Sequence, residues 1–536
     1  MISKFSRTVN SVLPRLHRLY TALLVSGASV VFTSAIATAL IMGVRQVGWL
    51  QAQELWAFDQ FIQWRSDEGP DPRLLIVAIT EEDLQRQDTW PLPDSTLEQL
   101  LDKLEQHKPQ AIGLDIYRDL PKPPGSREFS KRLHQSDRII AVCKVNDSSG
   151  NPGVAPPPSV PENRVGFADL LVDSGGILRR SLLFINPPPI NKPNAQNPHL
   201  CQKSDADVYS FSLRLALNYL KVEKIQPVLT PSQELKLGST VFKRLQNNSG
   251  GYRNTNFAGY QVLLNYRSRQ HIAPQVTLTE VLTDKVDPNL IKNRVVLIGT
   301  TAESIKDSFY TPYSAGQQKD QEMMGVTIHA QAVSQILSAV LDHRPLFWYW
   351  SNWGETTWIG VWSLSGGILA WQIRHPLRFG LASGVVLGGL LALCFGLFSQ
   401  GAWIPLVPSV YTFVLTAGSV VIVDRFNKAG YTKAISDRLK NPLKLNIEID
   451  QSKKERQVAE ITKTEYFQDL QKKGKELRNK RTIVTKNSNT NISLKLIETN
   501  KNSQTIKSLN IKYIRRLKDK IKNLKNRRDK TNTNSL

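Results

Sequence analysis

The feature that most constrains this chain is a set of long apolar runs without charged residues, placed on both sides of a long polar stretch. The first run, Tyr20–Val44, has no charged residue over 25 positions. At about 1.5 Å per residue, a helix of this length crosses a hydrocarbon core of about 30 Å. Three further charge-free runs lie close together near the other end: Thr356–Ile373, Phe379–Ser399 and Ala402–Val423. The sequence therefore predicts an integral membrane protein with four transmembrane helices, assigned to residues 20–44, 347–373, 379–399 and 402–423.

The first run has a competing interpretation as a cleavable signal peptide. Ala37 and Ala39 have the small-x-small spacing of a cleavage site, and Arg15 and Arg18 supply a basic segment before the run. The run is longer than the apolar region of a signal peptide, so we favour an uncleaved anchor. Both interpretations export the residues that follow.

Basic residues beside the apolar runs predict the orientation of the chain. They precede the first run, separate the second from the third, and follow the fourth: Lys4, Arg7, Arg15 and Arg18; Arg374 and Arg378; Arg425, Lys428 and Lys433. With four crossings, the positive-inside rule places all three groups in the cytoplasm. Residues 1–19 and the tail, residues 424–536, are then cytoplasmic, and residues 45–346 form an exported domain.

The net charge is concentrated in the tail. From Arg425 to Leu536 there are 30 Lys and Arg residues against 11 Asp and Glu, a net of +19 out of +23 for the whole chain. Only the tail therefore requires an anionic neighbour. Its Asn- and Lys-rich composition, with little apolar content in residues 487–510, predicts that it is mostly disordered.

One tail segment has helical periodicity. Ile514, Leu517, Ile521 and Leu524 follow three-four-three spacing. Basic residues fill the remaining positions: Arg515, Arg516, Lys518, Lys522, Lys525, Arg527 and Arg528. Such a helix can lie on anionic lipid of the inner leaflet, bind nucleic-acid phosphates or dock to an acidic protein. A solvated charged segment without a partner is the alternative, and the sequence leaves all of these open.

A glycine repeat in the third run predicts close helix packing. Gly380, Gly384 and Gly388 recur every four residues and leave one helix face nearly without side chains. We interpret this face as packing within the helix cluster. Packing between subunits of a homo-oligomer is the alternative.

The exported region alternates strand-like and helical patterns, which predicts an α/β fold. Six runs rich in Val, Ile and Leu are predicted strands: Leu74–Ile79, Ala111–Tyr117, Ile139–Val145, Leu182–Ile185, Val262–Tyr266 and Val295–Ile298. Predicted helices include an amphipathic stretch capped by Asp94, and the stretches Val208–Leu220 and Ala330–Leu341.

The three cysteines, Cys143, Cys201 and Cys394, do not form a disulfide framework or a spaced metal cluster. Cys143 and Cys201 could pair with each other. Because the sequence gives no geometry to support a bond between them, we favour two unconnected thiols.

A series of short motifs runs through the exported region, in this order: Phe58-Asp59-x5-Arg65, Trp90-Pro91-Leu92-Pro93, Ile112-Gly113-Leu114-Asp115-Ile116, Asp173-x-Gly175-Gly176-Ile177-Leu178-Arg179, Ile298-Gly299-Thr300-Thr301-Ala302, Asp307-Ser308-Phe309-Tyr310-Thr311-Pro312 and Gly325-Val326-Thr327-Ile328-His329-Ala330. Together they resemble the CHASE2 domain family, over roughly Trp49 to Val423. One departure is Ile79-Thr80-Glu81, where the family usually has Ile-Asp-Glu.

The resemblance implies an extracytoplasmic input module of a bacterial receptor, preceded by one membrane span and followed by three. It therefore implies a multi-pass protein of the bacterial plasma (inner) membrane that detects an environmental signal. The ligands of the family are largely undefined, so no binding residue is carried over.

Four polar residues are candidates for a ligand site: Asp59, Asp115, Asp307 and His329. Carboxylates and an imidazole also suit divalent cations, but no metal-ligand spacing supports a metal site, and we expect neither a metal nor a cofactor. We favour structural roles for all four, with the aspartates bonded to nearby backbone and His329 as a satisfied core residue.

The sequence contains no phosphate-binding Gly-rich loop with Lys and Ser or Thr, no Gly-x-Ser-x-Gly elbow and no His-Glu-x-x-His pair, and the tail has no kinase motif. We therefore expect a non-enzymatic sensor that relays its signal to a separate cytoplasmic protein. The alternative is a membrane tether whose tail binds nucleic acid, anionic lipid or an acidic protein. A third interpretation, an outward-facing hydrolase, requires Asp115, Asp307 and His329 to line one polar pocket.

Overall fold

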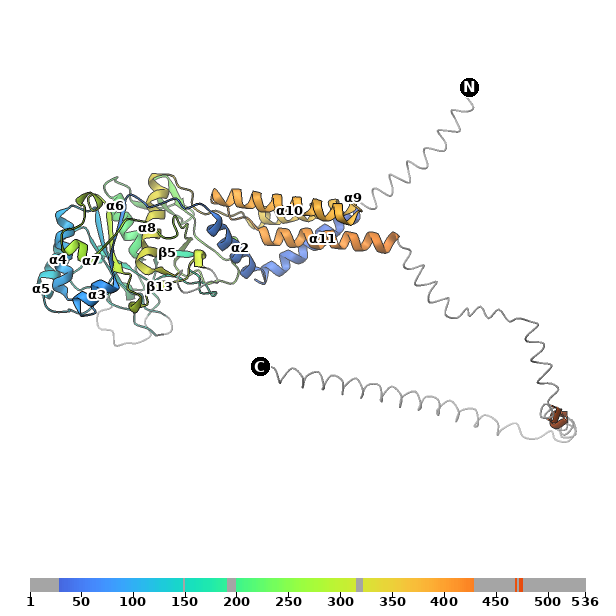
Figure 1. Ribbon diagram of the computed structural model, residues 1–536, viewed down its shortest axis with the longest axis horizontal. Coiled ribbons are helices and arrows are strands. Elements are labelled where there is room, and N and C mark those ends of the chain that lie inside the picture. The colour runs from blue at the N-terminus through green and yellow to red at the C-terminus, as the bar shows by residue number, and fades with distance from the viewer. Residues whose placement is uncertain are drawn as a thin grey trace, which may run out of the picture. The chain divides into compact units, whose positions relative to one another are not determined.

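The computed structural model describes residues 28–147, 150–189, 199–314, 322–428, 468–469 and 472–475. The chain divides into two units, Met1–Thr432 and Lys433–Leu536. The first unit contains an α/β domain and a group of long helices (Figure 1). Residues 1–19 and the seven basic residues assigned to the tail helix lie outside the described ranges.

A six-stranded sheet forms the centre of the domain. Its strand order is β11-β1-β12-β2-β3-β4, and every neighbouring pair is parallel. The strands are Gln275–Thr277 (β11), Leu74–Ile79 (β1), Val295–Thr300 (β12), Ala111–Leu114 (β2), Ile139–Cys143 (β3) and Val165–Phe167 (β4). A parallel sheet is covered on both faces, which explains the continuous Val, Ile and Leu runs in the sequence.

Helices cover both faces of this sheet (Figure 1). Asp94–Gln106 (α4), Ser126–Gln135 (α5) and Leu278–Leu282 (α7) share one apolar core with the sheet. Phe211–Leu220 (α6) and Gly325–Leu341 (α8) share the core on the opposite face. The predicted α/β class is confirmed.

Two motif glycines let helices approach the sheet closely. A Cβ at Gly113 in β2 would lie 2.6 Å from the Phe211 ring of α6. A Cβ at Gly299 in β12 would lie 2.6 Å from Cβ of Val326 in α8. Because neither glycine carries a side chain, the first turns of α6 and α8 lie against the ends of the strands.

Smaller elements surround this core. Two antiparallel sheets have the orders β10-β5-β6 and β7-β8-β9, and β13 pairs with β14. Their bounds are Tyr260–Leu263 (β10), Arg180–Ile185 (β5), Val208–Tyr209 (β6), Pro227–Leu229 (β7), Leu235–Leu237 (β8), Thr240–Phe242 (β9), Ser308–Phe309 (β13) and Met323–Met324 (β14). The remaining helices of the domain are Gln51–Trp64 (α2), Glu81–Gln87 (α3) and the short 3-10 helices Glu162–Arg164 (η1), Leu200–Gln202 (η2), Pro288–Leu290 (η3), Glu303–Ile305 (η4) and Pro312–Ser314 (η5).

Three local predictions need correction. The stretch Val208–Leu220 begins as strand β6, and α6 starts only after Ser210, whose hydroxyl accepts a hydrogen bond from the backbone N–H of Leu213. Helix α8 begins at Gly325, five residues before the predicted start. Asp94 does not cap α4; its carboxylate instead accepts hydrogen bonds from the backbone N–H of Lys122 and the hydroxyl of Ser126.

The prediction of four membrane helices is also wrong, because one of the four predicted helices does not qualify as a membrane span. In the described residues, three helices have the length and composition to cross a membrane: Ala28–Gln46, Pro376–Ser399 (α10) and residues 406–423 of α11 (Leu406–Lys428). The predicted second span corresponds to α9, Asn352–Gln372, which is long enough. It contains Glu355 and many Gly, Ser and Thr residues, and these lower its hydropathy.

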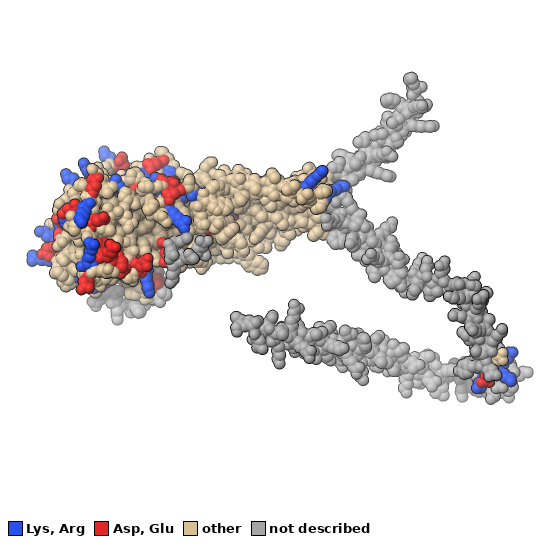
Figure 2. Space-filling view, viewed as in Figure 1, with Lys and Arg blue, Asp and Glu red and all other residues tan. Residues whose placement is uncertain are grey.

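Helix α9 nevertheless lies along α11 (Figure 1). A Cβ at Gly366 would lie 2.4 Å from the backbone oxygen of Phe413 in α11. The hydroxyl of Ser363 lies 2.7 Å from that of Thr416 in α11 and 3.1 Å from the backbone oxygen of Ser34. Figure 2 shows that charged side chains gather over the α/β domain and are nearly absent from the visible face of the helices.

Among the residues that the structure describes, the predicted glycine face of α10 meets no neighbour. A Cβ at Gly380, Gly384 or Gly388 would meet no described atom within 4 Å. The close backbone contact comes instead from Gly366, because the sequence shows a glycine repeat but not which helix face meets a neighbour. Packing of the α10 face between subunits stays a prediction.

The preference for two unconnected thiols was also wrong, because Cys143 and Cys201 form a disulfide. Their Cα atoms lie 6.3 Å apart, although 58 residues separate them along the chain. The bond joins the end of β3 to η2. Cys394 is a buried free thiol.

Candidate functional site

A pocket of about 590 Å³ opens where the parallel strands end. Thr300 ends β12, Asp115 follows β2, Lys144 follows β3, and Asp169 lies two residues after β4; all four line the pocket. Ligands of open α/β sheets bind at this edge, because the carboxyl ends of parallel strands and the loops that follow them meet there. The parallel topology therefore creates the pocket.

The first turns of α8 and the loop before it close the other side of the pocket. His329 and Gly325 come from α8, and Asp307 comes from the loop before β13. Aromatic rings of Trp90, Tyr117 and Phe309 complete the lining. The structure thus brings together three of the four candidate residues, Asp115, Asp307 and His329.

The carboxyl groups of Asp115 and Asp307 have unusual surroundings. The side chain of Asp115 is only 10% exposed. Among the described residues neither carboxyl group has a hydrogen-bond partner, and neither has a Lys or Arg nitrogen within 4 Å. Burial raises the pKa of Asp115 to about 7. Burial and the nearby charge of Asp115 raise the pKa of Asp307 to about 6.

His329 is buried and neutral. Its Nδ1 lies 3.1 Å from the hydroxyl of Ser212 in α6, and its Nε2 lies 3.9 Å from Oδ2 of Asp115. Burial lowers the pKa of His329 to about 4, although Asp307 acts in the opposite direction. One ring nitrogen of His329 thus bonds within the core, while the ring also lines the pocket.

Ser212, His329 and Asp115 follow one another in space like the nucleophile, base and carboxylate of a catalytic triad. Their distances and burial do not fit such a triad. The 3.9 Å separation between His329 and Asp115 is longer than a hydrogen bond. Ser212 is buried and does not line the pocket of Asp115; it lines a separate cavity of about 10 Å³. A substrate in the pocket would not reach its hydroxyl, so these three residues lack the arrangement for nucleophilic catalysis.

Asp59, the fourth candidate, lies elsewhere. Its carboxylate accepts hydrogen bonds from Nε and Nη2 of Arg179, at 2.7 and 2.6 Å. Arg179 and Arg180 both donate to Asp173, which also accepts a hydrogen bond from the hydroxyl of Tyr252. This buried network fixes α2 to the domain, and Asp59 bonds to the side chain of a distant arginine instead of to the nearby backbone that we expected.

A second buried ionic cluster joins the domain to the long helices, and sequence reasoning missed it. Arg45, at the end of the helix Ala28–Gln46, pairs with Glu54 of α2 at 3.0 Å and with Glu355 of α9 at 2.5 Å. Its Nη2 also donates to the backbone oxygen of Gly250 in the domain. The only sequence signal was that Arg45 directly follows the first apolar run and that Glu355, of opposite charge, directly precedes the second.

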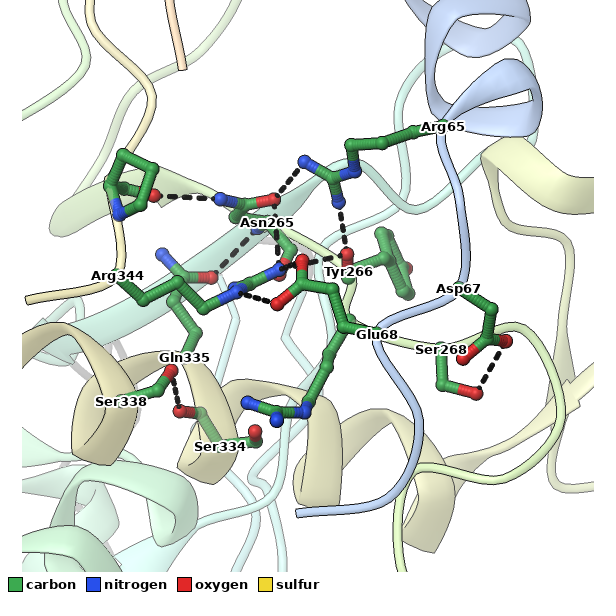
Figure 3. A network of polar contacts seen from close by, with 12 residues as sticks. Arg65, Asp67, Glu68, Asn265, Tyr266, Ser268, Ser334, Gln335, Ser338 and Arg344 are labelled. Carbon is green, nitrogen blue, oxygen red and sulfur yellow. Dashed lines mark hydrogen bonds and ion pairs between the residues drawn. The ribbon is translucent and has the colours of Figure 1, made fainter. Parts of the chain in front are cut away.

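A third polar network connects the segments by which the chain enters and leaves the domain (Figure 3). Arg65, directly after α2, donates to Oδ1 of Asn265 at 2.7 Å. Arg344, between α8 and α9, pairs with Glu68 at 2.6 Å and donates to the backbone oxygen of Asn265 at 2.9 Å. The Asn265 amide donates to the backbone oxygen of Pro345. The two segments are therefore held to one another.

No three His, Cys, Asp or Glu side chains are placed to share a metal ion within the ranges that the structure describes. The pocket carries three carboxyl groups of raised pKa, those of Asp115, Asp169 and Asp307, together with a neutral imidazole and several aromatic rings. This set suits binding of a small molecule.

Fold and pocket together define a membrane-anchored α/β domain with a ligand-sized pocket at the carboxyl edge of its sheet. The family model of the CHASE2 domain matches residues 36–368, more than half of the chain. The chain therefore belongs to the CHASE2 domain family, which indicates a sensory module. Searches of curated proteins and of solved structures found no match.

The raised pKa values predict how stability depends on pH. Both folded values lie above the ordinary aspartate pKa of 3.8, so the folded state binds more protons than the unfolded state between about pH 4 and 7. Each group therefore costs stability as the pH rises through this window. We expect Asp115→Asn and Asp307→Asn to raise the melting temperature at pH 8 and to have little effect near pH 4.

Thermal unfolding of the purified full chain across this pH range would check the expectation. Asp119→Asn, at an exposed position on the same loop as Asp115, is the control and should change nothing. Equal stability of the wild type and both pocket variants at pH 8 would contradict the burial of these two carboxyl groups without a cationic partner.

The Arg45 cluster predicts a strong and recoverable loss of stability. Arg45→Met leaves Glu54 without a cation and Glu355 with only Arg253, whose Nη2 lies 3.7 Å away; removing one partner of a buried ion pair costs about 3–5 kcal/mol. The double variant Arg45→Met and Glu54→Gln removes the unpaired carboxylate, keeps the Arg253–Glu355 pair and should recover much of the loss. Unfolding of the detergent-purified chain measures both variants; a double variant no more stable than the single one would speak against the ionic assignment.

Proposed function

We propose that this protein is a membrane-anchored sensor whose extracytoplasmic CHASE2 domain binds a signal molecule in the pocket of Asp115, Asp307 and His329. The observation that carries the proposal is the position of this pocket. It lies at the carboxyl edge of the parallel sheet of a domain whose family is sensory. The residues that line it come from six separate segments of the chain, so a ligand that contacts them can shift these segments relative to one another.

The Cys143–Cys201 disulfide supports the extracytoplasmic placement. Structural disulfides persist in oxidising compartments and are rare in the reducing cytosol. The bond is buried within the domain, between residues with no exposed surface. We therefore place the domain on the outer side of a bacterial plasma membrane.

Helix α8 offers a route from the pocket to the membrane helices. Its first turns carry Gly325 and His329, and its last turns carry Gln335 and lead to Arg344. Gln335 accepts a hydrogen bond from the backbone N–H of Asn265, within the network of Figure 3. A displacement of α8 by ligand would thus reach the segment that continues into α9, and the Arg45 cluster would pass it to the helix Ala28–Gln46.

The proposed output is a separate cytoplasmic protein that binds the basic tail, residues 424–536. The proposal assigns no catalytic reaction to this chain. The tether hypothesis remains the rival, with the tail bound to nucleic acid or anionic lipid. Binding of the isolated tail that falls steeply with ionic strength and is the same for every polyanion would favour the tether, because counterion release drives such binding.

A hydrolase is the second candidate, because Asp115, Asp307 and His329 do line one pocket, as that hypothesis requires. Two carboxyl groups of unequal pKa can act as an acid and a base. The sensor is favoured because the family is sensory and because Ser212, whose hydroxyl lies 3.1 Å from Nδ1 of His329, does not line the pocket.

Labelling in intact cells tests the placement. In a Cys394→Ser background, Lys292→Cys puts a thiol on the exposed surface of the domain, and Lys433→Cys puts one in the tail. A membrane-impermeant maleimide should label position 292 in intact cells and position 433 only after permeabilisation. If only α10 and α11 crossed the membrane, position 433 would lie on the same side as the domain. Label at 433 therefore also reports whether α9, which packs along α11, crosses together with α10 and α11.

Protection of position 292 in intact cells, with labelling after permeabilisation, would place the domain in the cytosol and end the sensor proposal. The Cys394→Ser chain without an added cysteine serves as the background control, since its two remaining cysteines form the disulfide.

A further inference from the structure

The carboxyl group of Asp115, which is largely buried, and that of Asp307, which is partly buried, have no hydrogen-bond or Lys or Arg partner among the described residues. Buried polar groups are nearly always hydrogen-bonded, and an unpaired buried charge is costly. The carboxyl of Asp115 is nine-tenths buried and faces the pocket, and its nearest charged or titratable neighbour nitrogen is Nε2 of His329, at 3.9 Å. Lys144 and Lys306 also line the pocket, but neither comes within 4 Å of Asp115 or Asp307. A bound molecule can supply the hydrogen-bond donors and the positive charge that the protein does not provide to these carboxyl groups.

The lining indicates which chemistry that molecule has. A group that donates several N–H bonds and carries positive charge would satisfy both carboxylates at once. The rings of Trp90, Tyr117 and Phe309 offer apolar area and π faces, which attract organic cations. A bare metal ion fits less well, because Asp115, Asp169, Asp307 and His329 line the pocket but no three acidic, His or Cys side chains among the described residues lie close enough to share an ion. The volume of about 590 Å³ matches a small organic molecule.

We propose that this pocket binds a small organic ammonium ion, with its N–H groups between the carboxylates of Asp115 and Asp307 and its hydrocarbon part against the aromatic rings. The inference rests on the proposed sensor function and names the ligand class of that same site. Lys144 and Lys306 would meet an acidic group of the ligand, so amino acids fall within the class.

The binding has a defined pH dependence. Asp115, Asp169 and Asp307 face the ligand position together with Lys144, Lys306, His329 and Tyr117. His329 stays neutral above its pKa of about 4, and the two unpartnered carboxyl groups ionise only as the pH passes about 6 and about 7. Amine binding should therefore strengthen from pH 5 to pH 8.

The test uses the purified full chain in detergent, with ethanolamine, putrescine and lysine at millimolar concentration. Bound amine stabilises the folded state, so each compound that binds raises the melting temperature. The matched controls are N-acetylethanolamine, N,N′-diacetylputrescine and Nα,Nε-diacetyllysine, which keep the skeleton without the ammonium group. We expect a shift with at least one amine, no shift with its acetylated partner, and at least tenfold weaker binding in Asp115→Asn and Asp307→Asn than in Asp119→Asn.

Three results would overturn the proposal: no shift with any of the three amines at pH 8, equal shifts with the acetylated controls, or a shift produced by Ca²⁺ that amines do not compete with. These results leave the labelling experiment untouched, so failure of the ligand class and failure of the sensor placement can be told apart.

A separate observation concerns α2, which carries an exposed and uncharged face. Trp49, Trp56 and Trp64 are 74%, 61% and 53% exposed. They recur at intervals of seven and eight residues, so they lie along one side of this helical segment. The remaining exposed or half-exposed positions of α2 carry Gln and Ala, while Phe58, Phe61 and Ile62 on the other side are buried.

The position of α2 determines what covers this face. The helix Ala28–Gln46 ends five residues before α2 begins, and Arg45 at that end pairs with Glu355 in the first turn of α9. The Trp64 ring lies 6.0 Å from that of Phe395, near the end of α10. Ends of three long helices therefore meet α2. Because amphipathic indole rings favour the headgroup layer, we infer that α2 lies on the outer leaflet with its tryptophans in the lipid interface.

Spin-label accessibility in vesicles of phosphatidylethanolamine and phosphatidylglycerol tests this placement. Labels are attached to Trp56→Cys and to Lys292→Cys, each in the Cys394→Ser background, with the full chain reconstituted. The label at position 56 should favour oxygen over a water-soluble nickel reagent by several-fold more than the label at 292. Equal, water-like accessibility at both positions would overturn the interfacial assignment.

Discussion

The constraint on which the rest of the domain depends is the burial of a six-stranded parallel sheet on both faces. Parallel strands cannot be joined by tight turns, so helical crossovers must run back over the sheet and cover it. As a result, the carboxyl ends of β12, β2, β3 and β4 reach one edge together. Residues from distant parts of the chain, such as Asp115 and Asp307, are thereby placed around one pocket.

The motif glycines serve the same arrangement. With Gly113 and Gly299 in the strands, α6 and α8 pack directly against the sheet at the pocket end. That contact places His329 between Ser212 and Asp115. The family motifs around these glycines therefore encode helix–sheet distance, and the polar residue beside each glycine motif faces the pocket as a consequence.

Ionic pairs perform the corresponding task at the membrane. Arg45, Glu54 and Glu355 come from three helices, and with Arg253, 3.7 Å from Glu355, two buried cations balance two buried carboxylates. The pairing explains how Glu355 is accommodated at the start of α9, beside apolar helices. Together with the network of Arg65, Glu68 and Arg344, it means that the domain and its helices share buried polar contacts. These contacts are the ones on which the proposed relay depends.

The sequence by itself determined the α/β class, most strands, the apolar helices and the family, because these depend on local periodicity and composition. Strand β1 was predicted with its observed bounds, since its six residues are all buried. The tertiary structure alone decided the rest. It separated Asp59, paired with Arg179, from Asp115 and Asp307, which have no such partner. It closed the disulfide across 58 residues, turned the α10 glycines away from the neighbouring helices and paired Arg45 with Glu355. Each of these depends on which distant segments meet, and spacing along one chain carries no measure of distance in space.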